Sequence, residues 1–246
     1  MKFSSLFSLP NILTLVNLFF GCMAVVFIFS YYMDFVPYCI AVCLVADFLD
    51  GFAARFTKSS SDIGKQLDSL ADVVSFGVVP GAILFQLLFQ KYESDAIFYS
   101  TTKIYLLSAP AFLVTMFAAL RLAKFNVDPR QSDTFIGLAT PAMTIFVIGY
   151  LLVVMNSPFG LTNLVFRKEI LYAIIIMFSL LMVVEIPMFS LKFKSFGWKG
   201  NEVVYVFIFL SLILLATLKF VAIPIIIILY VLISIALKLF KNELQS

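Results

Sequence analysis

The chain has 246 residues, of which 63% are apolar and only 13% are charged, and its mean hydropathy is +1.08. Soluble domains carry about 25% charged residues, so this composition excludes an ordinary soluble protein and indicates a polytopic membrane protein. The formal net charge of +3 comes without a long run of basic residues, which argues against a nucleic-acid partner and favours contact with membrane lipids.

Eight apolar stretches follow one another along the chain, most of them near the ~20 residues that a helix needs to cross a bilayer. We expect membrane-spanning helices over residues 10–29, 35–54, 64–89, 104–123, 137–155, 170–189, 203–218 and 220–239, the last two being the least clearly separated. The turns between them are short. The sequence therefore predicts an all-α fold, a polytopic membrane helix bundle.

The basic residues are unevenly divided between the two sides that these spans define. If the N-terminus is cytoplasmic, most of the 17 Lys and Arg residues fall in segments on the cytoplasmic side. Cytoplasmic loops of membrane proteins carry such an excess. We therefore expect an integral protein of the cytoplasmic membrane, with both termini and the acidic motif described next on the cytoplasmic side.

Four aspartates stand where the second predicted span ends and the third begins. Asp47 and Asp50 are three residues apart, whereas Asp68 and Asp72 are four apart, so each pair lies on one helical face. The short polar loop 57–62 makes the two helices antiparallel and brings the pairs together. Carboxylates in a low-dielectric site repel one another unless cations compensate them. Oxygen ligands favour Mg²⁺ or Mn²⁺, and four carboxylates suffice for two ions.

Small residues and an arginine accompany the aspartates. Gly51 follows the first pair, and Gly64 precedes the second pair by one turn on a stripe that ends at Ser75. Glycines at these positions leave room for a phosphorylated ligand near the backbone, and Arg55 is placed to hold a phosphate oxygen. Together these features favour a metal-dependent phosphate-ester site. A proton or ion relay in a transporter and a structural pairing of helix ends are the alternatives.

The spacing Asp-x2-Asp-Gly-x2-Ala-Arg-x8-Gly-x3-Asp-x3-Asp resembles the signature of the CDP-alcohol phosphatidyltransferases. All eight fixed positions are present, namely Asp47, Asp50, Gly51, Ala54, Arg55, Gly64, Asp68 and Asp72. The resemblance implies a six-helix catalytic membrane domain over residues 1–195 with a two-metal site, followed by a C-terminal transmembrane helix pair over residues 196–246. It also implies a homodimer.

The same resemblance suggests a role for each residue of the motif. The metal ligands would be Asp47, Asp50, Asp68 and Asp72, and Asp72 would also be the catalytic base. The nucleotide and its diphosphate would be bound by Gly51, Ala54, Arg55, Gly64 and Ser75. Because the chain contains no histidine, a route through a covalent phosphohistidine is closed, and proton transfer must fall to a carboxylate.

Further segments are similar to the branch of this family whose acceptor is L-serine. They are Pro10–Asn17 in the first span, Asp72–Gly77 in the third, Arg121–Asn126 after the fourth and Phe135–Ala142 entering the fifth. The implied reaction transfers the phosphatidyl group of CDP-diacylglycerol to the serine hydroxyl and releases CMP. A related enzyme whose acceptor is glycerol 3-phosphate or inositol phosphate is the alternative within the family.

Serine requires a donor for its carboxylate. Arg121 fits this need by charge and by its planar fork of donors, with Asn126 and Lys65 as further candidates, although a positive-inside anchor is an equally good interpretation of Arg121. For Asn17, hydrogen bonding between helices is the expected role. Glu185 departs from the family pattern, and we expect it to reach toward Lys192, a place near the substrate amine being the alternative.

Overall fold

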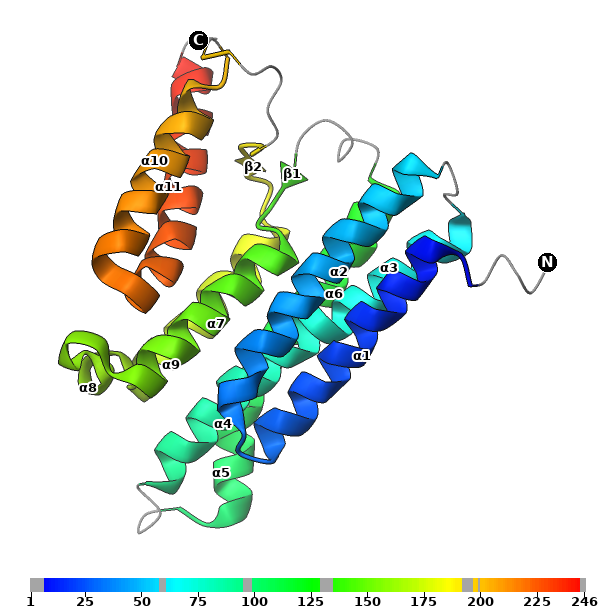
Figure 1. The fold of residues 1–246 in the computed structure, drawn as a ribbon. Helices are drawn as coiled ribbons and strands as arrows, with labels where there is room; N and C mark the ends of the chain where they lie inside the picture. The colour runs from blue at the N-terminus through cyan, green and yellow to red at the C-terminus, as the bar shows by residue number, and fades with distance from the viewer. Residues whose placement is uncertain are drawn as a thin grey trace.

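The computed structural model describes residues 7–57, 61–94, 99–128, 135–191, 197–198 and 200–243. Within these ranges the chain forms long helices packed into a bundle (Figure 1). The only strands in the described part of the chain are two short ones that pair with each other. The predicted all-α membrane bundle is therefore confirmed, with one small addition of β structure.

The N-terminal half begins with α1 (Leu9–Phe29), the short turn η2 (Met33–Phe35) and α2 (Val36–Phe56). Helix α3 (Asp62–Val73) continues through the π-helical turn η3 (Val74–Val78) into α4 (Val79–Glu93), and α5 (Thr101–Ser108) continues through η5 (Ala109–Phe112) into α6 (Leu113–Val127). Proline stands in the first turn of α1 and α2, where its missing N–H costs nothing.

The C-terminal half contains α7 (Thr140–Asn156), the short turns η7 (Pro158–Gly160) and α8 (Thr162–Val165), and α9 (Lys168–Val183). Strand β1 (Phe135–Ile136) precedes α7 and pairs antiparallel with β2 (Pro187–Met188), which follows α9. Two further helices, α10 (Glu202–Leu218) and α11 (Ala222–Glu243), are joined by the turn η8 (Lys219–Val221) and form a hairpin beside α7 (Figure 1).

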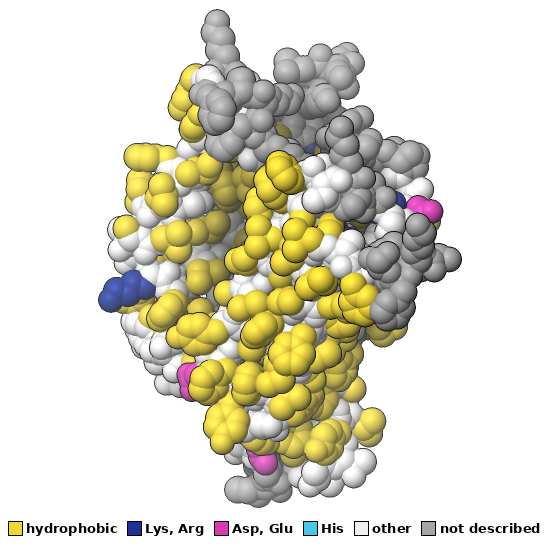
Figure 2. Space-filling view, turned by 45° about the vertical axis from the view of Figure 1, so that its right-hand side comes forward, with side chains coloured by type: hydrophobic (Ala, Val, Ile, Leu, Met, Phe, Trp, Pro, Cys, Tyr) yellow, Lys and Arg dark blue, Asp and Glu magenta, His cyan; other side chains and the backbone are white. Residues whose placement is uncertain are grey.

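Five segments of the described chain are long and apolar enough to cross a membrane. They are Leu9–Phe29, Met33–Phe56, Asp62–Glu93, Thr101–Val127 and Glu202–Leu239. The last of these contains the α10–α11 hairpin, since Lys219 turns the chain with a φ of 51°. Large apolar side chains cover much of the described surface in Figure 2. Such a surface suits hydrocarbon rather than water, so the protein is an integral membrane protein.

The core lies around α4. In the segment Asp62–Glu93, 83% of the apolar stretch is buried, against 22–33% in the other four segments. Residues from every side of α4 are buried, among them Ile83, Leu84 and Leu88, which are fully inaccessible. A helix that is apolar all round is enclosed by its neighbours. Helix α4 therefore lies at the centre of the bundle, and α1, α6, α7 and α9 pack against it.

The predicted sixth span is wrong at its C-terminal end. It was expected to run to residue 189, whereas α9 ends at Val183 and residues 184–191 contain strand β2. Pro187 explains the early end, because proline lacks an N–H and disfavours helical backbone in the preceding residue. Gly137 faces this segment with a φ of +75°, and a Cβ there would lie 2.5 Å from the Met182 carbonyl oxygen.

Candidate functional site

A polar stripe on α1 forms one wall of the site. Asn11, Thr14 and Asn17 are spaced three residues apart, so they share a face of the helix, and all three are at most 3% exposed. Thr14 Oγ1 donates to Asp50 Oδ2 at 2.6 Å, and Asn17 Nδ2 donates to Asp72 Oδ1 at 3.2 Å. Helix α1 thus bridges the two helices that carry the acids.

The expected helix–helix hydrogen bond of Asn17 is therefore confirmed. Sequence reasoning did not assign roles to Asn11 and Thr14, which lie on the same stripe. The signal was available, since three polar residues at a helical spacing within an apolar span mark a face that meets other polar groups.

Three of the four aspartates form a compact cluster. Asp47 and Asp50 on α2 and Asp68 on α3 each offer a carboxylate oxygen, and these atoms all lie within 4.8 Å of one another. Asp68 Oδ1 is buried without a hydrogen-bond partner among the described residues. Close carboxylates and an orphaned buried oxygen are unfavourable without a compensating cation. The donor set, which is oxygen alone, fits a hard divalent ion.

Asp72 occupies a separate position on the same helix. It is 8% exposed, its Oδ1 accepts the hydrogen bond from Asn17, and it lies outside the group of three. Four residues separate it from Asp68, so it lies one turn further along α3, next to the π-helical turn η3. Turns of this kind are frequent at functional sites. The structure therefore divides the four predicted ligands into a cluster of three and one acid beside it.

A cavity of about 260 Å³ opens next to the cluster. It is lined by Pro10, Asn11 and Thr14 of α1, by Asp50, Gly51 and Ala54 of α2, and by Ser61, Gly64, Lys65 and Asp68 at the start of α3. Carboxylates thus stand on one side of the cavity and the N-terminal turn of α3 on another. A helix N-terminus favours negative charge, so a metal-bound phosphate group suits the space between them.

The glycines in the cavity wall have different surroundings. A Cβ at Gly51 would meet no heavy atom within 4 Å, so this position leaves open space for a ligand. A Cβ at Gly64 would lie 3.0 Å from Asn11 Oδ1 and 3.1 Å from Ser61 Oγ. Ser61 also caps α3, accepting a hydrogen bond from the Gly64 N–H at 3.0 Å. Gly64 therefore gives α1 room to approach as well as bordering the cavity.

Two residues predicted for the nucleotide side do not line this cavity. Arg55 lies on the exposed end of α2. Ser75 is fully buried, and its hydroxyl donates to the Ala71 carbonyl at 3.1 Å. A Cβ at Gly21 of α1 would lie 3.2 Å from Ser75, so Ser75 belongs to the contact between α1 and η3.

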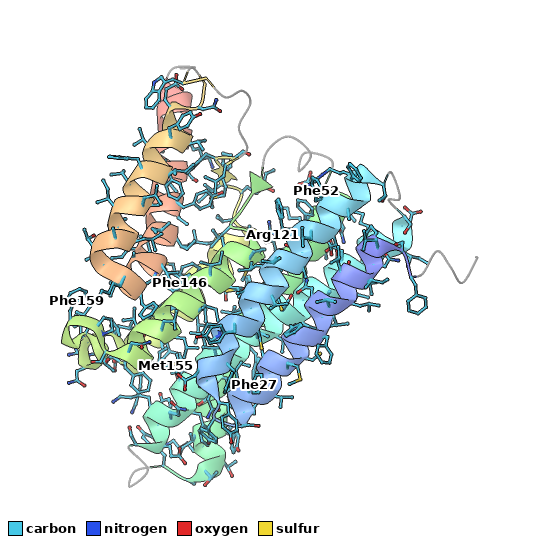
Figure 3. The ribbon with its side chains drawn as sticks, viewed as in Figure 1. Phe27, Phe52, Arg121, Phe146, Met155 and Phe159 are labelled. Carbon is cyan, nitrogen blue, oxygen red and sulfur yellow. The ribbon has the colours of Figure 1, made fainter. Side chains whose placement is uncertain are left out.

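Arg121 on α6 is a buried cation. It is 7% exposed, its Nε has no hydrogen-bond partner among the described residues, and its guanidinium lies 5.7 Å from the centre of the Phe125 ring. The carboxylate of Asp72 lies close enough for its negative charge to act on it. In Figure 3 it lies toward the same end of the bundle as Phe52 of α2. A buried guanidinium whose Nε–H donor has no acceptor is suited to an anionic ligand.

Lys65 and Asn126, the other two candidates for serine binding, contact different residues from those near Arg121. Lys65 lines the acidic cavity and donates to the Asn126 carbonyl at 3.3 Å. The Asn126 amide donates to Ser69 Oγ at 2.7 Å, which ties α6 to α3. Of the three predicted residues, only Lys65 borders the cavity beside the aspartates.

Glu185 makes a contact that was not expected. Its Oε1 accepts from Lys124 Nζ at 2.9 Å, so it pairs with the helix that carries Arg121. Lys192, toward which it was expected to reach, lies outside the described residues.

Comparison with known proteins bears directly on this arrangement. The chain matches the family described as CDP-alcohol phosphatidyltransferase over residues 7–185. It is 31% identical over 221 residues, covering 89% of this chain and 86% of the relative, to a Helicobacter pylori protein named CDP-diacylglycerol-serine O-phosphatidyltransferase.

Proteins of the same name from Methanocaldococcus jannaschii and Saccharomyces cerevisiae are similar over shorter stretches. The first is 39% identical over 45% of this chain and 47% of the relative, and the second 37% identical over 56% of this chain and 50% of the relative. The family match covers α1 to α9, which includes the whole acid-lined cavity. The chain therefore belongs to the CDP-alcohol phosphatidyltransferase family.

Proposed function

We propose that this protein transfers the phosphatidyl group of CDP-diacylglycerol to the hydroxyl of L-serine, giving phosphatidylserine and CMP. The observation that carries the proposal is the cavity with Asp50 and Asp68 in its wall and the N-terminus of α3 beside them. This arrangement suits a diphosphate with bound cations. The choice of serine as acceptor is supported by the names of the relatives.

Asp47, Asp50 and Asp68 would hold Mg²⁺ or Mn²⁺, and Asp72 would join them as a ligand when two ions bind. Support comes from the spacing of the three carboxylates and from the orphaned Asp68 oxygen. Ions held there would supply positive charge to neutralise the diphosphate and the departing CMP. Thr14 would hold Asp50 in the orientation that this role requires, since groups behind metal ligands fix their geometry.

The protein side of the reaction falls mainly to Asp72. The serine oxygen attacks the phosphorus of the phosphatidyl group, a new P–O bond to serine forms, and the P–O bond to CMP breaks with its electron pair leaving on the CMP phosphate. Asp72 would accept the proton of the serine hydroxyl. Asn17 occupies Oδ1 of this carboxylate, which leaves Oδ2 for the proton.

The remaining motif residues would bind the nucleotide and its diphosphate. Gly51, Ala54 and Gly64 border the cavity, and Gly51 leaves space for close approach of a ligand. Arg55 would bind a phosphate oxygen from the exposed end of α2, and Ser75 would act through the packing of α1 on η3.

Arg121 would bind the carboxylate of serine, with Lys65 and Asn126 in lesser roles. Its burial and unpartnered Nε support this assignment, because a buried charge without a partner is costly. Asp72, the proposed base, lies close enough to Arg121 for its negative charge to act on the guanidinium. A serine held by Arg121 would then present its hydroxyl on the side of the acids.

The surroundings of the site complete the proposal. The acidic end of the bundle would face the cytoplasm across the cytoplasmic membrane, as the distribution of Lys and Arg favours. Residues 1–195 would form the catalytic domain and residues 196–246 a C-terminal helix pair, and the protein would act as a homodimer. Chemical cross-linking of the purified protein, compared with a monomeric membrane protein of similar size, tests the last point.

Release of labelled CMP tests the proposed reaction. Purified protein in detergent is given CDP-diacylglycerol labelled in its cytidine, Mg²⁺, and one acceptor at a time from serine, glycerol 3-phosphate and inositol 1-phosphate. We expect release that depends on serine. Release with a phosphorylated acceptor alone would assign the chain to another branch of the family, and no release with any of the three acceptors would contradict the proposed reaction.

A further inference from the structure

One face of α11 binds the backbone of the chain that follows α9. Tyr230, Ser234 and Lys238 are four residues apart, so they lie on one stripe of the helix. The Tyr230 hydroxyl donates to the Phe189 carbonyl at 3.0 Å, and Ser234 Oγ accepts from the Phe189 N–H at 3.3 Å. Lys238 Nζ donates to the Glu185 carbonyl at 3.0 Å.

The segment held in this way, residues 184–191, also contacts the helix that carries Arg121. The carboxylate of Glu185 pairs with Lys124 at 2.9 Å, and Lys124 follows Arg121 by three residues, on the same side of α6. The stripe on α11 is therefore linked to the helix that carries Arg121 through the 184–191 segment.

Residues 189–191 of this segment border an open space. A cavity of about 550 Å³ lies between the start of α7, residues 189–191 of the segment and the α10–α11 hairpin, with Phe189, Phe207 and Tyr230 among its walls. Side chains that border such a space lose contacts on one side. Pairing with β1 holds the middle of the segment, and the three hydrogen bonds from α11 hold it on either side of that pairing, at Glu185 and at Phe189.

We propose that Tyr230, Ser234 and Lys238 are positioning residues of the acceptor site. They hold the 184–191 segment in place, so that Glu185 can pair with Lys124. This pairing orients the face of α6 from which Arg121 binds the carboxylate of an amino-acid acceptor. The C-terminal helix pair, α10 and α11, then contributes to the selection of the acceptor. This proposal rests on the proposed function, in which Arg121 binds that carboxylate.

Steady-state kinetics of Tyr230→Phe and Lys238→Met test the proposal. Each loses one hydrogen bond to the segment, so the apparent KM for serine should rise by about three- to tenfold. The KM for CDP-diacylglycerol should stay within twofold of the wild-type value. Lys238→Arg, which keeps a donor, should restore the serine KM.

Tyr150→Phe is the matched control. Its hydroxyl donates to the Val165 carbonyl, so it loses the same kind of buried bond near the opposite end of α7, and its serine KM should equal that of the wild type. The double variant Lys124→Met/Lys238→Met should raise the serine KM by less than the product of the single effects, because both changes release the same segment.

Three outcomes would count against the proposal. Wild-type serine kinetics in both Tyr230→Phe and Lys238→Met would overturn it and leave the proposed function standing. If Tyr230→Phe and Lys238→Met raised the KM for serine and the KM for CDP-diacylglycerol equally, and Tyr150→Phe did the same, the stripe would have only a structural role. Wild-type protein that uses no serine would overturn the proposed function itself and this proposal with it.

Discussion

The acid-lined cavity and the surroundings of Arg121 are built in different ways. The aspartates and the glycines of the cavity come from one stretch, residues 47–72, completed by the polar stripe of α1, and its contacts join side chains to side chains. Near Arg121, α6 is joined to the 184–191 segment by the ion pair between Lys124 and Glu185, and that segment is joined to α11 by side chains that bind backbone. Local sequence thus determines the acid cluster, whereas long-range packing determines how the helix that carries Arg121 is held.

The largest effect is expected at the cluster of three. Asp47→Asn, Asp50→Asn and Asp68→Asn should each reduce turnover by at least about 10³-fold, because a lost metal ligand removes several kcal/mol of transition-state stabilisation. Chelation of divalent ions should abolish activity, and Mg²⁺ or Mn²⁺ should restore it. Full turnover in excess EDTA would show that the cluster does not work through a metal.

Substitution of Asp72 should lower turnover without weakening substrate binding. If it accepts the serine proton, Asp72→Asn should lower kcat by about 10²-fold or more, while equilibrium binding of CDP-diacylglycerol is largely kept. Binding can be followed by retention of the labelled lipid on immobilised protein. A variant with near-normal kcat would place the base elsewhere.

Thr14 on the polar stripe of α1 should affect metal binding more than the chemical step. Thr14→Val removes the hydroxyl that donates to Asp50 and keeps the shape of the side chain. The Mg²⁺ concentration for half-maximal activity should rise by roughly 10- to 100-fold, with kcat at saturating Mg²⁺ little changed.

Thr144→Val is a suitable control for this variant. Thr144 is also fully buried, but its hydroxyl donates to the carbonyls of Phe76 and Thr140 and not to an acid. Its Mg²⁺ dependence should match that of the wild type, and an equal shift in the two variants would mean that Thr14 has no special relation to Asp50.

The smallest of these effects is expected at Arg121. Replacing a planar fork by a point charge loses bidentate recognition, so Arg121→Lys should raise the serine KM by about tenfold, a loss of about 1.4 kcal/mol. The KM for CDP-diacylglycerol should be little changed. A variant that weakens CDP-diacylglycerol and leaves serine untouched would assign Arg121 to the diphosphate and move the serine pocket toward Lys65 and Asn126.

Much of the fold followed from hydropathy. The first four predicted spans lie within the helical segments from Leu9 to Val127, because a run of about 20 apolar residues has few alternatives to a membrane helix. The sixth prediction failed at its end, since apolar residues continue past Pro187 and hide the change from helix to strand. Pairing of β1 with β2 joins residues far apart in sequence, which no local pattern reveals.

The site was predictable where spacing fixes geometry. Asp47, Asp50 and Asp68 were expected to converge and do so. The bond between Thr14 and Asp50 and the pairing of Lys124 with Glu185 depend on how separate helices rotate against one another. That rotation is decided by packing over the whole bundle, so spacing within one helix does not determine it.

The central claim is that the acid cluster is the active centre of a serine-using phosphatidyltransferase. Its most direct test gives purified wild-type protein and Asp68→Asn labelled serine together with CDP-diacylglycerol and Mg²⁺, and measures labelled lipid and CMP in the same tube. The account predicts that wild type forms the two products in equal amounts and that Asp68→Asn, folded by thermal melting, forms almost none. Serine-independent CMP release, or wild-type yields from Asp68→Asn, would contradict it.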